Sequence, residues 1–243
     1  MRLALAALLL VSCVGPKRAE RAASRVDLGA AYYREGNPEA AITTLREAVK
    51  MDPRNWRARN TLAVAYIAKQ EPELAEEAFE GALRLNPDEA EILVNYGAFQ
   101  LKAGRVDEAI ATFEKALKDL DYRNPPLIQS NLALAMLQAN RLDEALAYAR
   151  EAVRRQPLLC EGWFHVGLVQ ERRKDQPAAL EAYRKLVETC PNEGVGARLR
   201  TGCIQVEVGM AEEGVAELRR VISEAPNTPL ADEARVCLRS LEQ

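Results

Sequence analysis

The 243-residue chain lacks most of the residues on which enzymes and metalloproteins depend. It has a single histidine, His165, and no Cys-x-x-Cys pair, so the ligand spacing of a zinc site is missing. There is no glycine-rich phosphate loop and no Gly-x-Ser-x-Gly sequence. Cys160 and His165 are the one conceivable nucleophile pair, but a spacing of five along a helix turns the side chains apart. We therefore predict a non-enzymatic chain with no catalytic residue and no metal ligand.

The chain also lacks an excess of positive charge. It contains 33 Lys and Arg against 36 Asp and Glu, which gives a formal net charge of −3. Nucleic-acid-binding domains carry a basic patch or stripe. Here a dense basic run, Arg172-Arg173-Lys174, stands between Glu171 and Asp175, as on a solvated turn. We predict no nucleic-acid partner.

What the sequence does contain is a period. Small residues recur in register at steps of 34, 34, 36, 34 and 35 residues. The first set is Gly29, Ala63, Gly97, Ala133, Gly167 and Gly202. The second set, twelve residues later, is Ala41, Ala75, Ala109, Ala145, Ala179 and Gly214. Self-similarity near 34 residues is the mark of tetratricopeptide repeats, each a hairpin of two helices.

Other motif positions of this repeat are also filled. The first copy has Leu28-Gly29 and Tyr32, and Pro53 ends its second helix because proline lacks the N–H that a helix interior needs. We predict an all-α fold, a right-handed superhelical solenoid of six tetratricopeptide helix-turn-helix repeats with a C-terminal capping helix. The predicted repeats are 22–55, 56–89, 90–123, 126–159, 160–193 and 195–228, and the capping helix is 229–243.

The first thirteen residues have the pattern of a lipoprotein signal. One arginine precedes an apolar run of about nine residues, too short to span a bilayer. The run ends in Leu10-Val11-Ser12-Cys13, which resembles the bacterial lipobox and implies cleavage before Cys13 and lipid attachment there. We expect a signal peptide at 1–12, a lipidated linker at 13–21, and no cofactor besides the covalent lipid. The residue after Cys13 is Val14 and not aspartate, which in lipoproteins of this kind implies sorting to the outer membrane. We therefore expect the protein to be anchored there and to face the periplasm. The alternative is an ordinary secretory signal.

Four further cysteines follow, at Cys160, Cys190, Cys203 and Cys237. An even number in an exported chain suggests disulfides. Cys160 starts the first helix of the fifth repeat and Cys190 follows its second helix. Those two ends meet in an antiparallel hairpin, so we predict a Cys160–Cys190 disulfide. Cys203 and Cys237 lie at equivalent positions in the first helices of successive hairpins. They could form a second disulfide or remain two buried thiols, and the sequence leaves both alternatives open.

The first helix of each repeat has positions that face the concave side of such a solenoid. Most of them are apolar here, and they are not core positions of the repeat. The predicted partner-binding groove comprises Val26, Tyr33, Asn60, Val64, Ile67, Val94, Leu101, Leu134 and Leu137. An apolar groove with a charged rim suits an amphipathic helix or an apolar peptide. The alternative is that tight superhelical curvature buries part of this stripe.

Five features of the sequence are shared with one known family. They are the lipobox, the six repeats, Asn95-Tyr96-Gly97, the insertion at 119–125 and the run from Ser130 to Leu134. With these features, the chain resembles the PilF/PilW family of type IV pilus lipoproteins over about residues 10 to 228. The resemblance implies an outer-membrane pilotin. Such a protein binds an amphipathic or apolar segment of secretin (PilQ) subunits and promotes their membrane insertion and multimerisation for pilus assembly and motility.

Two other functions stay open. One is a generic periplasmic scaffold lipoprotein that recruits envelope enzymes such as proteases or peptidoglycan enzymes. The other is a thiol-dependent activity at Cys160 or Cys190. The four cysteines of the mature chain depart from many members of the family, so the role of the last two repeats is not implied by the resemblance.

Overall fold

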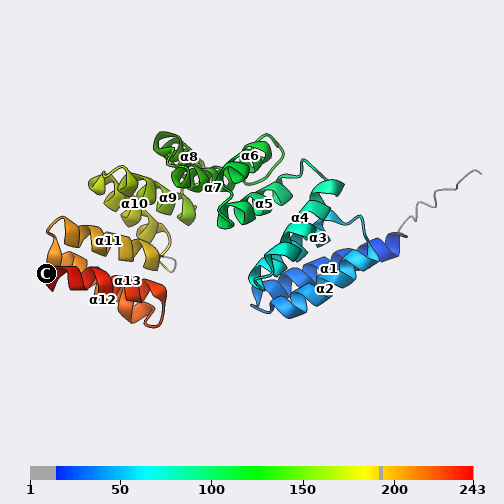
Figure 1. Ribbon diagram of the computed structural model, residues 1–243, viewed down its shortest axis with the longest axis horizontal. Helices are drawn as coiled ribbons and strands as arrows, with labels where there is room; N and C mark the ends of the chain where they lie inside the picture. The colour runs from blue at the N-terminus through cyan, green and yellow to red at the C-terminus, as the bar shows by residue number, and fades with distance from the viewer. Residues whose placement is uncertain (1–14, 192–193, 243) are drawn as a thin grey trace, which may run out of the picture. The chain divides into compact units, whose positions relative to one another are not determined.

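The computed structural model describes residues 15–191 and 194–242, and in this part of the chain every regular element is a helix (Figure 1). The α-helices are α1 (Pro16–Arg34), α2 (Pro38–Met51), α3 (Trp56–Ala68), α4 (Pro72–Leu85), α5 (Ala90–Lys102), α6 (Val106–Ala116), α7 (Pro125–Gln138), α8 (Leu142–Arg155), α9 (Cys160–Arg172), α10 (Gln176–Thr189), α11 (Val195–Glu207), α12 (Ala211–Glu224) and α13 (Pro229–Arg239). A short 3₁₀ turn, η1 (Ser240–Glu242), follows α13.

The chain divides into two compact units, with the boundary between Phe99 and Gln100. In the first unit α1, α2, α3 and α4 pack in chain order, and α1 also lies against α3. In the second unit α6 to α13 pack in chain order, and contacts between alternate helices join α7 to α9 and α11 to α13. Consecutive hairpins that contact only their neighbours are the pattern of a repeat solenoid. The predicted all-α fold of tetratricopeptide hairpins is confirmed.

The first helix begins earlier than the sequence suggested. Residues 16–21, expected to be part of a linker, form the first turns of α1. Pro16 suits this start, since its missing N–H is one that the first turn leaves unpaired in any case. The signal peptide at 1–12 and the lipidation site Cys13 lie outside the described residues.

The period of small residues has a direct packing cause. Leu45 and Tyr183, each fully buried on a second helix, lie sixteen residues after Gly29 and Gly167 of the paired first helix. A Cβ atom on Gly29 would come within 2.5 Å of the Leu45 side chain, and one on Gly167 within 2.2 Å of the Tyr183 ring. The small residue therefore makes room for the large one, and this contact sets how closely the two helices of a hairpin approach.

The turns inside the hairpins also follow a rule. After the first helix one residue has a positive φ, which glycine adopts without strain, as at Gly36 with φ 74° and Gly209 with φ 85°. Gln70, Asn140 and Lys174 take the same conformation at the corresponding positions of other repeats. The reversal is thus a property of the repeat, and it is kept even where the side chain disfavours it.

Candidate functional site

The predicted groove residues of the first unit do not all reach the surface. Val26 and Val94 are buried, and Val26 belongs to the core shared by α1 to α4. Val64 and Ile67 are half-buried against that core, and Tyr33 is 39% exposed. The first helices α1 and α3 lie against each other, so positions expected to line a groove fill the space between helices instead. Of the groove residues predicted in this unit, Tyr33, Val64 and Ile67 are the ones that remain accessible.

Asn60 is a second correction in this unit. It is only 1% exposed and makes hydrogen bonds across the repeat boundary instead of facing a partner. Its Nδ2 donates to Oε1 of Glu91 at 3.1 Å, and its Oδ1 accepts from Nδ2 of Asn95 at 3.2 Å. Buried amides stabilise a fold only when they are satisfied. Asn60 therefore fixes the register of α3 against α5. Sequence reasoning missed this role because Glu91 and Asn95 belong to the next repeat.

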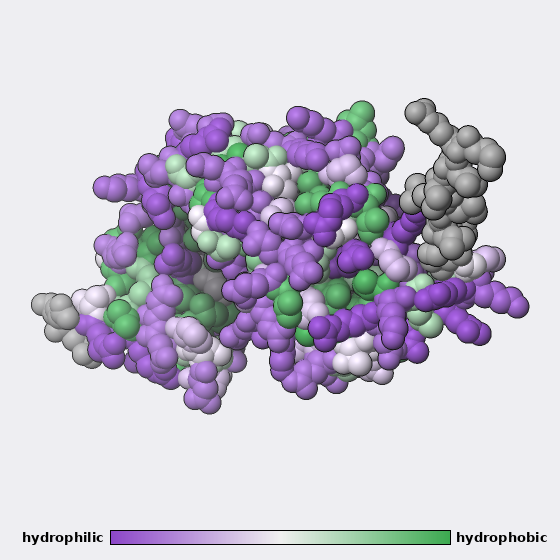
Figure 2. Space-filling model, turned by 45° about the vertical axis from the view of Figure 1, so that its right-hand side comes forward, coloured by the Kyte–Doolittle hydropathy of each residue, from purple (hydrophilic) through white to green (hydrophobic). Residues whose placement is uncertain are grey.

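The second unit shows the same division. Leu101 and Leu137 are buried, whereas Leu134 is half-buried on α7. The five buried members of the predicted groove are core or inter-helix residues in this structure. On the face drawn in Figure 2, apolar residues show as separate areas bordered by polar ones.

His165 is a packing residue of α9. It is buried, and its Nδ1 lies 2.8 Å from the hydroxyl of Ser130 on α7. Burial lowers the pKa of His165 to about 4, because the charged imidazolium loses its hydration. The ring is therefore neutral at pH 7 and joins two successive first helices through one hydrogen bond. The sulfur of Cys160 is bonded to Cys190 and is no free nucleophile, and Ser130 is fully buried together with the ring.

Two disulfides cross-link the second unit. Cys160 is joined to Cys190 with a Cα–Cα distance of 6.1 Å, the pairing predicted from the ends of the fifth hairpin. Cys203 is joined to Cys237 with a Cα–Cα distance of 5.5 Å, so α11 and α13 approach closely enough for the bond that the sequence left open. The disulfides leave none of these four sulfurs as a free thiol for the thiol-dependent alternative.

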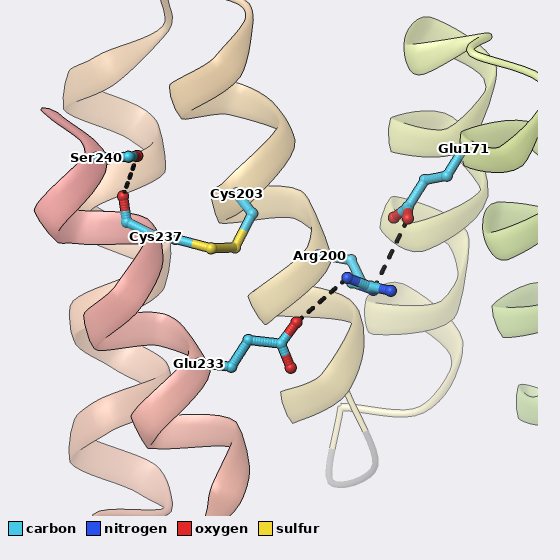
Figure 3. The surroundings of a disulfide bond; sticks show 6 residues. All are labelled: Glu171, Arg200, Cys203, Glu233, Cys237 and Ser240. Atoms are coloured by element: carbon cyan, nitrogen blue, oxygen red, sulfur yellow. Dashed lines mark hydrogen bonds and ion pairs between the residues drawn. A yellow bond between two sulfur atoms is a disulfide. The ribbon is translucent and has the colours of Figure 1, made fainter.

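A charged network lies beside the second disulfide (Figure 3). The hydroxyl of Tyr183 donates to Oε1 of Glu171 at 2.8 Å, and Arg200 bridges Glu171, at 3.8 Å, to Glu233, at 3.3 Å. Burial raises the pKa of both Glu171 and Tyr183. The network ties α9, α10 and α11 to the capping helix α13, so we interpret it as a brace of the C-terminal end. It also borders a recess of about 490 Å³ whose lining includes Lys174 and Glu207.

The described residues contain no group of three or more His, Cys, Asp or Glu side chains arranged to hold a metal ion. Among the described helices none is long and apolar enough to cross a membrane.

Comparison with known families agrees with this architecture. The sequence model of the tetratricopeptide repeat matches residues 26–88, 61–126 and 130–193. These ranges cover well over half of the chain, and the protein therefore belongs to the tetratricopeptide repeat family.

One relative gives a narrower similarity. The chain is 33% identical over 129 residues to the type IV pilus assembly protein PilF of Pseudomonas aeruginosa, a match that covers 53% of this chain and 51% of PilF. The chain thus spans about half the length of this curated relative.

Two solved structures share the fold over nearly their whole length. The first, from work on P. aeruginosa PilF, has a TM-score of 0.76 at 23% identity and covers 90% of this chain and 99% of that one. The second, PilW, described as a widely conserved type IV pilus biogenesis factor, has a TM-score of 0.80 at 22% identity and covers 91% and 98%. At these identities the likeness shows the fold alone.

Proposed function

We propose that the protein is an outer-membrane pilotin of type IV pilus assembly. In this proposal it binds secretin (PilQ-like) subunits in the periplasm and promotes their membrane insertion and multimerisation. The observation that carries the proposal is the 33% identity to PilF over 129 residues. On the residues that resemble the PilF/PilW family, we place the chain nearest to the pilotin Tgl.

Three further features support this proposal. The sequence Leu10-Val11-Ser12-Cys13 fits lipid attachment at Cys13, which would hold the protein at the membrane where a secretin assembles. Two disulfides suit an oxidising compartment such as the periplasm and are rare in the cytosol. Repeat solenoids present extended surfaces for other proteins, so binding without chemistry is the expected mode of action.

The secretin segment would contact the members of the predicted groove that stay accessible. These are Tyr33, Val64 and Ile67 in the first unit and, considered separately, Leu134 in the second. An aspartate in such a contact would have to lose its hydration without a partner, at a cost of several kcal/mol. We therefore expect Val64→Asp and Leu134→Asp to weaken capture of unassembled secretin at least about tenfold.

Matched controls separate binding from folding. Leu74 of α4 is 37% exposed and Leu120 is 95% exposed, and neither belongs to the predicted groove. Leu74→Asp and Leu120→Asp should bind secretin like the unchanged protein. Circular dichroism should show the same helix content in all four variants. Unimpaired binding by both Val64→Asp and Leu134→Asp would exclude these residues as the secretin contact in either unit.

A further inference from the structure

One end of the first unit gathers positive charge. Segment 16–21 begins α1, and segment 50–57 runs from the last residues of α2 into the start of α3. The structure brings the two together, since Nη2 of Arg18 donates to the backbone oxygen of Lys50 at 3.1 Å. The basic residues of these two segments are Lys17, Arg18, Arg21, Lys50, Arg54 and Arg57, against the acidic residues Glu20 and Asp52.

These cations are exposed and unpaired. All six side chains are exposed, and within the described residues none of them forms an ion pair with a carboxylate. Other basic side chains of the same unit do have partners. Arg25 pairs with Glu47, Lys69 with Glu39, and Arg84 with Glu80. Six cations without a carboxylate partner are thus brought together at this end, although the whole chain is slightly acidic.

A tryptophan lies among these cations. Trp56 is the first residue of α3 and is half-buried, with the Arg57 guanidinium 5.2 Å from its ring centroid. Indole side chains favour the boundary between water and lipid, where their apolar body and their N–H both find suitable surroundings. A half-buried indole with an arginine at its ring, next to further exposed cations in the same segments, is the composition expected of a surface that meets anionic headgroups.

The position along the chain points to the same ligand. Only two residues separate Cys13 from Pro16, where α1 begins, so the chain between them spans at most about 10 Å. If Cys13 carries the lipid, as the proposed function holds, the basic end is kept close to the bilayer. Stable anchoring generally takes two signals, such as acyl chains plus a basic patch.

We propose that this basic end of the first unit, formed by residues 16–21 and 50–57, binds anionic phospholipid headgroups. The patch would then be a second membrane signal beside the lipid. It would also orient the unit, with the first turns of α1 and α3 toward the bilayer. This inference rests on the lipidation in the proposed function, but its test does not.

The test uses the mature chain, residues 13–243, with Cys13→Ser so that no lipid contributes. Binding is measured by co-sedimentation with vesicles of phosphatidylethanolamine and phosphatidylglycerol, and with vesicles of phosphatidylcholine alone. We expect at least tenfold stronger binding to the anionic vesicles, weakened as salt is raised. Arg54→Glu with Arg57→Glu should lower that binding about tenfold or more.

A charge-matched control is available in the same unit. Arg34, the last residue of α1, and Lys69, which follows α3, are also exposed and lie at the opposite ends of the two helices whose first turns carry the patch. Arg34→Glu with Lys69→Glu changes the net charge equally and should leave vesicle binding within about twofold of the unchanged chain. Equal losses in both double variants, or no preference for anionic lipid, would overturn the proposal.

Tryptophan fluorescence gives an independent readout. The chain has two tryptophans, so Trp163→Phe leaves Trp56 as the only emitter. Brominated phosphatidylglycerol should quench the fluorescence of Trp56 in vesicle-bound protein. Unquenched fluorescence would contradict the proposal that the basic end of the first unit contacts the bilayer. If the Arg54/Arg57 variant binds vesicles normally but loses secretin, the patch recognises an acidic protein segment and the lipid proposal is wrong. If the Arg54/Arg57 variant loses vesicle binding but still captures secretin, the result supports lipid binding by the patch, independently of the surface that binds the partner.

Discussion

Gly167→Ala tests the packing rule that links the sequence period to the fold. Gly167 lies within α9, opposite the fully buried ring of Tyr183 on α10. An added Cβ would come 2.2 Å from Cε1 and 2.6 Å from Cζ of that ring, where ordinary contact needs about 3.4 Å or more. The ring must therefore move by about an ångström, which also breaks the 2.8 Å hydrogen bond from its hydroxyl to Glu171.

The magnitude follows from three contributions. Overpacking a filled site costs about 1–3 kcal/mol. Loss of a hydrogen bond to a charged group costs about 1.5–3 kcal/mol. Replacing a glycine inside a helix by alanine stabilises the helix by about 1 kcal/mol, which offsets part of these costs. We therefore expect Gly167→Ala to lower the free energy of unfolding of the second unit by about 1.5–5 kcal/mol.

The assay is urea unfolding in a Trp56→Phe background, so that fluorescence reports Trp163 of the second unit alone. Gly196→Ala is the matched control, because a Cβ there would lie 3.7 Å from the Phe164 ring, an ordinary contact. That control should be neutral or more stable by up to about 1 kcal/mol. An unchanged or higher urea midpoint for Gly167→Ala would refute the explanation that the small residues recur because each makes room for a large side chain of the paired helix.

The remaining predictions concern the second unit. The pKa of His165 is lowered to about 4 from an ordinary 6.5, so the unfolded chain binds a proton there before the folded chain does. The free energy of unfolding should be highest above pH 6.5 and fall by up to about 3 kcal/mol as the pH drops toward 4. His165→Gln should flatten this pH dependence, measured by urea unfolding at several pH values. An unchanged pH dependence in the variant would contradict the role of His165. Cys203→Ser should lower the unfolding free energy by about 4 kcal/mol in the chain-entropy model, since the Cys203–Cys237 bond closes a separation of 34 residues. Reductant should lower the stability of the variant less than that of the wild type, and equal losses would show that this disulfide contributes nothing.

The period of small residues was enough to predict the hairpins and their order. Each hairpin is held by contacts between residues such as Gly29 and Leu45, which are close in sequence and repeat in register. The Cys160–Cys190 pairing could be predicted for the same reason, because an antiparallel hairpin brings its own two ends together.

Properties that depend on distances between hairpins could not be predicted in this way. Whether Val26 is a groove or a core residue depends on how closely α1 and α3 approach, and a sequence period does not contain that distance. The Cys203–Cys237 bond depends on a similar approach between α11 and α13. Which residues lie at the surface therefore follows from the structure, whereas the hairpin fold follows from the sequence period.

The most direct test of the proposed function is the amount of heat-resistant secretin multimer in a strain that lacks this protein. We predict that multimers disappear while secretin subunits persist, and that the wild-type gene restores them. Normal multimer levels in the deletion strain would contradict the pilotin proposal and favour a scaffold that recruits envelope enzymes.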